Sequence, residues 1–231
     1  MRKLFILAGI LAILGAAAHA QFPGRRYVRA NGEAAVSVKP DLLKLTAGVV
    51  TQGVTAQEAA DQNATQVTSV LTKLRQVLGP NADIKTTSYS LSPNYRYPQG
   101  GGQPVLTGYT ASNNVEITTS DLSLAGRLID AAVSGGATNV QGLRFTLKDF
   151  EPPRAQALRL ATIQAKNHAE AIALGLGVKL GAVLSAQEGT AVRATTLDVR
   201  AEAGGGSVPT PVETGMVEVQ ATVVLDVEIV P

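Results

Sequence analysis

Cysteine is absent from all 231 residues, and this absence removes several classes of function. A chain without thiols cannot form disulfides, hold a metal through thiolates or run a thiol peroxidase cycle. Many exported proteins rely on disulfides, but a chain of this length can bury roughly 70% of its unfolded surface. We therefore expect its stability to come from an apolar core alone.

Aromatic residues and histidine are scarce as well. Phe, Trp and Tyr make up 4% of the sequence, and tryptophan is missing. Glycoside hydrolysis uses two carboxylic acids that flank the scissile bond, and enzymes that bind sugars tend to add aromatic platforms. The 18 acidic residues are scattered instead, and Glu218, Asp226 and Glu228 fall on the polar face of an expected strand, where solvation suits them.

No catalytic, cofactor-binding or metal-binding residue is predicted. His168 lies in the middle of an expected helix, without a serine and a carboxylate arranged for a triad, and is interpreted as a surface histidine. The glycine triplets at 100–102 and 204–206 lack the Lys-Ser/Thr pair of a phosphate-binding loop. Asn63 begins a glycosylation sequon, but it falls inside an expected helix.

The first twenty residues predict export. Arg2 and Lys3 precede an apolar run, Leu4 to Ala17, that is short for a membrane span, and Ala18-His19-Ala20 provides small residues for cleavage before Gln21. A leader that stays attached as a membrane anchor is the alternative. The expected location is the periplasm, or the cell wall or medium if the source cell lacks an outer membrane.

The mature chain carries no net charge. Removing Arg2 and Lys3 from the 20 basic residues leaves 18, equal to the 18 acidic residues. The sequence also lacks a cluster of lysine and arginine. Nucleic acid is therefore not an expected partner.

Three helices are expected from apolar residues at helical spacing, at 56–78, 121–133 and 153–174. Thr55 and Glu58 match a capping box before the first helix. The residues expected to face inward are Ala60, Ala64, Val67, Val70, Leu71, Leu74, Val77 and Leu78 in the first helix, Leu124, Ala125, Leu128, Ile129 and Ala132 in the second, and Leu158, Ala161, Ala165, Ala169, Ile172 and Ala173 in the third.

Strands fill most of the remaining chain. The last strand alternates apolar residues from Val217 to Ile229 with polar ones, which is typical of an antiparallel sheet with one buried face. Residues 201–215 are rich in glycine and proline and predict a flexible loop. The expected strands are two segments within 32–51 separated by Lys39-Pro40-Asp41, followed by 83–91, 105–118, 138–149, 180–188 and 216–229.

These elements predict an α+β domain over residues 21–231. The order strand–helix–strand occurs twice, in halves at about 32–91 and 138–188, with two long helices packed on a mainly antiparallel sheet. A short helix and long β-ribbons complete it. Within the stretch GYTASNNVEI, residues 108–117, Asn113 falls in an otherwise apolar row, so we expect its amide to bond a neighbouring loop or helix end.

This chain resembles the SIMPL-domain family of exported bacterial proteins, some of them named oxidative stress defence or periplasmic immunogenic proteins. The resemblance rests on GYTASNNVEI, on DLSLAGRLIDAAVSGGATNVQGLRFTL, on GEAAVSVKPDLLKLTAGVV and IKTTSYSLSPNYRY upstream, and on RAQALRLATIQAKNHAEAIALGLGVKLG downstream. It implies an exported α+β protein, periplasmic or membrane-associated, that tends to self-assemble. It supplies no catalytic residues.

Three functions are consistent with these observations. The first is a non-enzymatic envelope protein that acts through self-assembly into a homo-oligomer or through binding, with an indirect part in oxidative stress defence. The second is an envelope hydrolase with a dispersed carboxylate site. The third is a carrier or chaperone for an apolar ligand.

Overall fold

A computed structural model describes residues 24–80, 82–189, 194–195, 198–199 and 212–231. The expected leader, the glycine triplet at 204–206 and most of the expected loop at 201–215 lie outside these ranges. Within the described part of the chain, no helix is both long and apolar enough to cross a bilayer.

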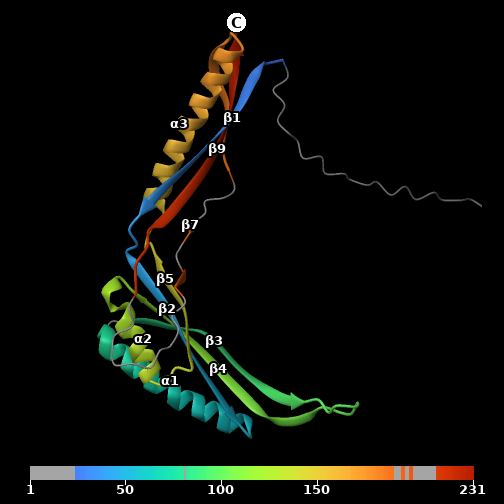
Figure 1. The fold of residues 1–231 in the computed structure, drawn as a ribbon, viewed down its shortest axis with the longest axis vertical. Coiled ribbons are helices and arrows are strands. Elements are labelled where there is room, and N and C mark those ends of the chain that lie inside the picture. Colours follow the sequence, from blue (N-terminus) through green and yellow to red (C-terminus); the bar gives the residue numbers. More distant parts are fainter. Residues whose placement is uncertain (1–23, 81, 190–193, 196–197, 200–211) are drawn as a thin grey trace, which may run out of the picture.

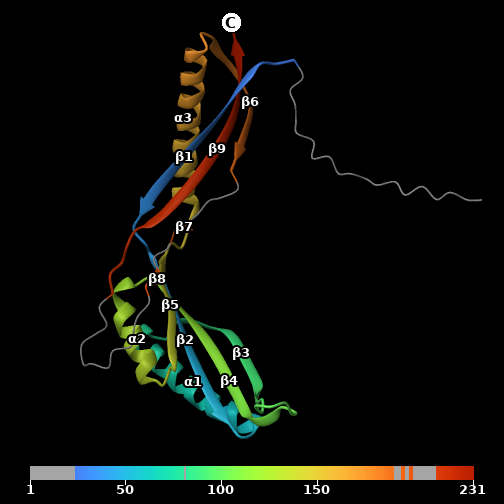
Figure 2. The same cartoon turned by 45° about the vertical axis from the view of Figure 1, so that its right-hand side comes forward.

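The molecule is elongated and consists of two lobes, each an antiparallel sheet with helices on one face (Figures 1 and 2). The expected α+β class is confirmed. The upper lobe has strand order β1-β9-β6, with β7 also on β9, and the lower lobe has order β3-β4-β2-β5-β8. The elements are β1 (Tyr27–Val38), β2 (Leu42–Gly53), α1 (Ala56–Leu78), β3 (Asp83–Arg96), β4 (Val105–Thr119), η1 (Leu122–Leu124), α2 (Ala125–Ser134), β5 (Asn139–Thr146), α3 (Glu151–Gly175), β6 (Lys179–Glu188), β7 (Ala194–Thr195), β8 (Asp198–Val199) and β9 (Val217–Val230).

The two sheets do not correspond to the two consecutive halves that the sequence predicts. The break expected at Pro40 is where the chain leaves one sheet for the other, because β1 belongs to the upper lobe and β2 to the lower. Within 138–188, β5 joins the lower sheet while α3 and β6 belong to the upper lobe. Both strand–helix–strand orders are present, but the second one spans two sheets.

Helix α1 covers the inner face of the lower sheet. Thr55 accepts a hydrogen bond from Glu58 N at 3.2 Å, as expected of a capping box. The Glu58 carboxylate accepts in return from Val54 N at 3.0 Å, one residue before Thr55. Ala60 is half-buried and Ala64 exposed, so the expected inward face was wrong over the first turns. The buried residues are Ala59, Asn63, Val67, Val70 and Leu74.

After its first turn, the buried residues of helix α3 on the upper sheet are all alanines. Its buried residues recur every four positions, and Ile172, expected to face inward, is exposed. A repeat of four drifts by about 40° per turn relative to the helix period of 3.6, so the contact line winds around the helix along the twisted strands. The stripe consists of Ala157, Ala161, Ala165, Ala169 and Ala173.

Gly32 of β1 allows α3 to lie this close. A Cβ atom at Gly32 would stand 2.0 Å from Ala161 O and 2.4 Å from Ala165 N, and both are backbone atoms that cannot swing aside. The helix therefore rests on the strand where both partners have almost no side chain. Val28, Val223, Leu225 and Val227 fill the remaining space of this core.

The lower lobe has a core of large side chains. Phe145, Leu43, Leu74 and Leu128 are almost fully buried between the sheet, α1 and α2. Ala111, Val115 and Ile117 of β4 are buried as the alternation predicts, and the other face of that strand is half-exposed. The lower lobe therefore contains the larger of the apolar core clusters.

Strand β3 is longer than expected. The stretch SPNYRYPQGGGQP after residue 91 is rich in glycine and proline and predicts a loop, but its residues 92–96 pair with β4 up to Arg96 opposite Val105. Proline cannot donate to a central ladder, and β3 tolerates it because it is the edge strand of its sheet. The result is a long β3–β4 hairpin that extends beyond the rest of the lower lobe (Figure 1).

Candidate functional site

His168 lies on α3 and serves the fold. Its Nδ1 is 2.7 Å from Asn31 O, and because a carbonyl oxygen can only accept, the ring donates from Nδ1. Gln164, one turn earlier, accepts from Glu33 N at 2.6 Å. The two side chains bond outward-facing backbone groups of β1, the edge strand of the upper sheet, and so partly cover that edge.

Asp226 differs from the expectation that it faces solvent. Its side chain is only 5% exposed, and Arg29 on β1 donates to both carboxylate oxygens, at 2.7 and 2.9 Å. These hydrogen bonds from Arg29 hold the pKa of Asp226 below its usual value against the opposing effect of burial. The carboxylate joins β1 to β9, so it is a structural cross-link, which sequence alternation alone could not distinguish from a solvated acid.

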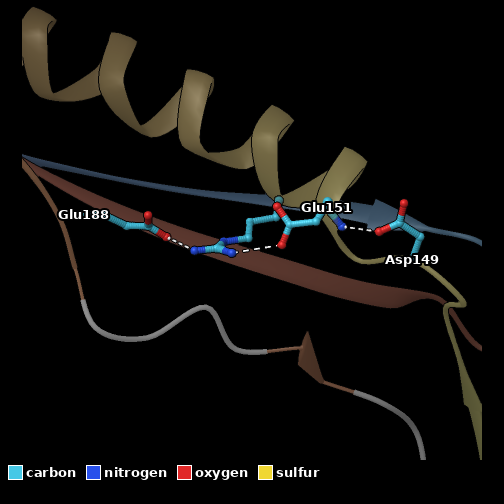
Figure 3. A network of polar contacts seen from close by, with 4 residues as sticks. Asp149, Glu151 and Glu188 are labelled. Atoms are coloured by element: carbon cyan, nitrogen blue, oxygen red, sulfur yellow. Dashed lines mark hydrogen bonds and ion pairs between the residues drawn. The ribbon is translucent and has the colours of Figure 1, made fainter.

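Two further acids converge on an arginine at the base of α3 (Figure 3). Arg154 donates to Glu151 at 2.9 Å and to Glu188 of β6 at 2.8 Å, and these contacts raise the pKa of Arg154. Asp149 accepts from Glu151 N at 2.8 Å at the start of the helix. This is an ion-pair clamp between α3 and β6, in which one guanidinium binds two carboxylates.

The amide that ties a helix to the lower sheet is Asn63, not Asn113. Asn63 is 1% exposed and donates to Val49 O at 3.0 Å and to Ala111 O at 3.3 Å, which joins α1 to β2 and β4. Asn113 lies half-buried on the inner face, and its Oδ1 has no protein partner. Burial also makes Asn63 inaccessible in the folded chain as a glycosylation site.

Two grooves on the described surface have polar side chains in their lining. One lies between α1 and the end of α2 and is lined by polar side chains, among them Asp61, Gln62, Thr65 and Gln66. A second, at the β1–β9 pair, is lined by Glu33, Gln220, Thr222 and three alanines. Within the described ranges, no group of three or more His, Asp or Glu could hold a metal ion.

A group of exposed apolar side chains lies on the β3–β4 hairpin. Tyr97 is 73% exposed and Tyr89 53% exposed, and alternation along β3 places Tyr89, Leu91 and Tyr95 on one face. No acidic residue occurs between Asp83 and Glu116. We call this the hairpin surface, and it comprises Tyr89, Leu91, Tyr95, Tyr97, Val105 and Leu106.

The outer part of this hairpin is a ribbon of two strands only. Strand β2 ends at Gly53, opposite Tyr109, so residues of β4 before Tyr109 pair with β3 alone. Gly100 and Gly101 have positive φ and open space around them, which fits the turn punctuation expected of this triplet. A two-stranded ribbon is marginally stable by itself, so burial against a partner would stabilise it.

Comparison with known families gives one match over most of the chain. The profile of SIMPL, described as a protein of unknown function (DUF541), matches residues 28–227. The match includes both lobes and the hairpin.

Curated relatives are similar over much of their length. The protein named uncharacterized protein YggE from Escherichia coli K12 is 29% identical over 187 residues, covering 79% of this chain and 74% of the relative. YggE from Edwardsiella ictaluri is 29% identical over 182 residues, covering 78% and 76%. The 26 kDa periplasmic immunogenic protein of Brucella melitensis is 28% identical over 159 residues, covering 65% and 63%.

Proposed function

The chain belongs to the SIMPL family, and from that premise we propose that it is an exported envelope protein that acts by self-association and binding, with no reaction of its own. The hydrogen bonds and ion pairs that its titratable side chains form within the fold support this proposal. His168 donates to a backbone carbonyl of β1, and Asp226 accepts from Arg29. Arg154 donates to the carboxylates of Glu151 and Glu188. A general acid or base needs a free position beside a substrate, and these groups are committed to the fold.

The hairpin surface carries the self-association part of the proposal. Tyrosine is enriched at protein interfaces, because its large ring buries apolar area while the hydroxyl still finds a partner. Low charge on the hairpin, with only Lys85 and Arg96 between Asp83 and Glu116, lets two copies approach without burying carboxylates. Edge strand β3 adds backbone groups that a second copy can pair.

A two-fold arrangement suits these features best. Antiparallel pairing of β3 with β3 of a second copy would use the same patch on both chains. It would continue the lower sheet across two molecules and bring the two hairpin surfaces together. The thin outer ribbon would then be buried in the assembly, which accounts for its stability.

Export supports an envelope location. The leader predicts secretion, and a similar protein of Brucella melitensis bears the name periplasmic immunogenic protein. In stress defence we propose an indirect role, because the mature chain has no cysteine and Met216 as its one methionine.

Sizing tests the self-association. Light scattering of residues 21–231 across micromolar concentrations is expected to give a multiple of the monomer mass. The Tyr89→Ser/Leu91→Ser variant removes the apolar centre of the hairpin surface and is expected to be a monomer. A matched control, Leu160→Ser/Ile163→Ser, removes two exposed apolar residues of α3 and should keep the parental mass.

The outcomes separate the parts of the proposal. A parent chain that stays a monomer at every concentration overturns self-association. A hairpin variant that assembles like the parent, with an unchanged circular dichroism spectrum, shows that the contact lies elsewhere. Rapid stoichiometric consumption of peroxide by the purified metal-free protein would refute the indirect role in stress defence.

A further inference from the structure

A second apolar surface lies at the opposite end of the molecule from the hairpin (Figures 1 and 2). At the turn between α3 and β6, Leu174 is 82% exposed and Leu176 is 63% exposed. Val230 at the end of β9 and Tyr27 at the start of β1 are also exposed. We call this end the α3–β6 pole.

The two leucines are not needed to build the turn. Gly177 has a φ of +70°, and the turn closes through backbone bonds from Gly177 N to Leu174 O and from Val178 N to Ala173 O. Scattered exposed leucines are common, but a cluster at one end of a molecule is typical of an interaction surface.

Two cationic residues lie at strand ends of this pole. Ile229 N donates to Arg26 O at 3.0 Å and Lys179 pairs with Val230, so Arg26 and Lys179 stand at neighbouring strand ends. Two nearby carboxylates are paired with other arginines, Glu228 with Arg25 at 3.9 Å and Asp226 with Arg29, and Glu170 lies one helical turn before Leu174. Among the described side chains, Arg26 and Lys179 have no carboxylate at ion-pair distance and add positive charge to the pole.

The chain outside the described residues joins the fold at this pole. Residues 1–23 include the apolar run Leu4 to Ala17 and connect to Gly24, next to the start of β1. Six residues separate the run from Gly24, and this linker spans at most about 25 Å when extended. A leader that stays attached would therefore hold the pole, and not the hairpin, close to the membrane.

We propose that the α3–β6 pole docks on an anionic phospholipid surface, with Leu174 and Leu176 inserted at the headgroup boundary and Arg26 and Lys179 facing lipid phosphates. Exposed leucines beside basic side chains are the combination that holds peripheral proteins on bilayers. This inference rests on the proposed export but not on self-association, which uses the other end of the molecule.

Vesicle flotation of residues 21–231 tests the proposal. The parent chain is expected to float with phosphatidylcholine vesicles that contain phosphatidylglycerol, and less with phosphatidylcholine alone. Leu174→Ser/Leu176→Ser is expected to weaken binding by about tenfold or more, because two leucines lose their insertion. Arg26→Ser/Lys179→Ser should weaken binding to the anionic vesicles only, and added salt should remove that difference.

Two controls separate this inference from the proposed function. Leu160→Ser/Ile163→Ser removes equally apolar residues from the middle of α3 and should float like the parent. Tyr89→Ser/Leu91→Ser should float as a monomer, with any loss attributable to avidity restored by a higher protein concentration. A parent chain that binds neither vesicle, or a folded Leu174→Ser/Leu176→Ser variant that floats like the parent, overturns the proposal. Equal binding to both vesicles overturns the role of the two cations.

Discussion

The two lobes share a plan and differ in what fills the space between helix and sheet. In the lower lobe, large side chains such as Phe145 and Leu128 separate α1 and α2 from the strands. In the upper lobe, α3 rests on β1 and β9 through an alanine stripe and Gly32. The lower core is therefore sensitive to lost side-chain volume and the upper core to added volume, because both are densely packed.

Added volume in the upper lobe should have the largest effect. Gly32→Val places a branched side chain against the backbone of Ala161 and Ala165 and is expected to cost about 3 kcal/mol or more of unfolding free energy. Urea denaturation followed by circular dichroism measures the loss. Gly175→Ala is the matched control, since no atom lies within 4 Å of its ideal Cβ, and it should stay within about 0.5 kcal/mol of the parent.

Lost volume in the lower lobe comes next. Leu74→Ala removes a fully buried side chain between α1 and the sheet and should cost about 2–5 kcal/mol. The same truncation at Leu160, which is exposed on α3, should cost far less. Equal losses at the two positions, measured by urea denaturation, would show that the contrast between the lobes is wrong.

The buried amides of the lower lobe provide a finer test. Asn63→Val leaves two backbone carbonyls without their donor and should cost roughly 1–3 kcal/mol. Asn113→Val removes a carbonyl oxygen that has no protein partner and should leave stability unchanged or raised. Thermal unfolding of the two variants should shift in different directions, and similar losses in both would contradict the assignment of Asn63 as the bonded amide.

The smallest expected effect concerns the cross-link of the upper sheet. The Arg29 contact lowers the pKa of Asp226 in the folded state. The contact therefore stabilises the fold fully above the unfolded pKa of about 3.9, and this stabilisation is lost as the pH falls through the folded pKa. The parent should be more stable than Asp226→Asn at neutral pH, and the difference should shrink below about pH 4. Unfolding midpoints across this range measure it, and a difference that widens in acid would rule out the mechanism.

Local signals were enough to predict the helices and the positions of the longer strands. The bounds of α1 follow from Thr55 and Gly79, where a side-chain cap and a positive φ begin and end the helix. The last strand follows from its alternation, and its inner face is buried as predicted. These features depend on residues that are close to one another in the sequence, so they can be predicted from the sequence alone.

Long-range contacts could not be predicted in the same way. Strands β1 and β2 show the same alternation but join different sheets, and no local feature assigns a strand to its partner. A helical period of 3.6 placed Ile172 inward, whereas the alanine repeat of four follows the twist of the strands. Asp226 was misjudged and the bonding role of Asn63 was missed, because their partners, Arg29 and the carbonyl of Ala111, are distant in sequence.

The pairing of β1 with β9 joins the two ends of the chain, and Arg29 and Asp226 are 197 positions apart. During synthesis the first strand is made early, and its ladder can close only when the final residues are available. The lower lobe can form meanwhile, because most of its strands come from the middle of the chain. We therefore expect α3, with its alanine stripe, to be made before the upper sheet can be completed.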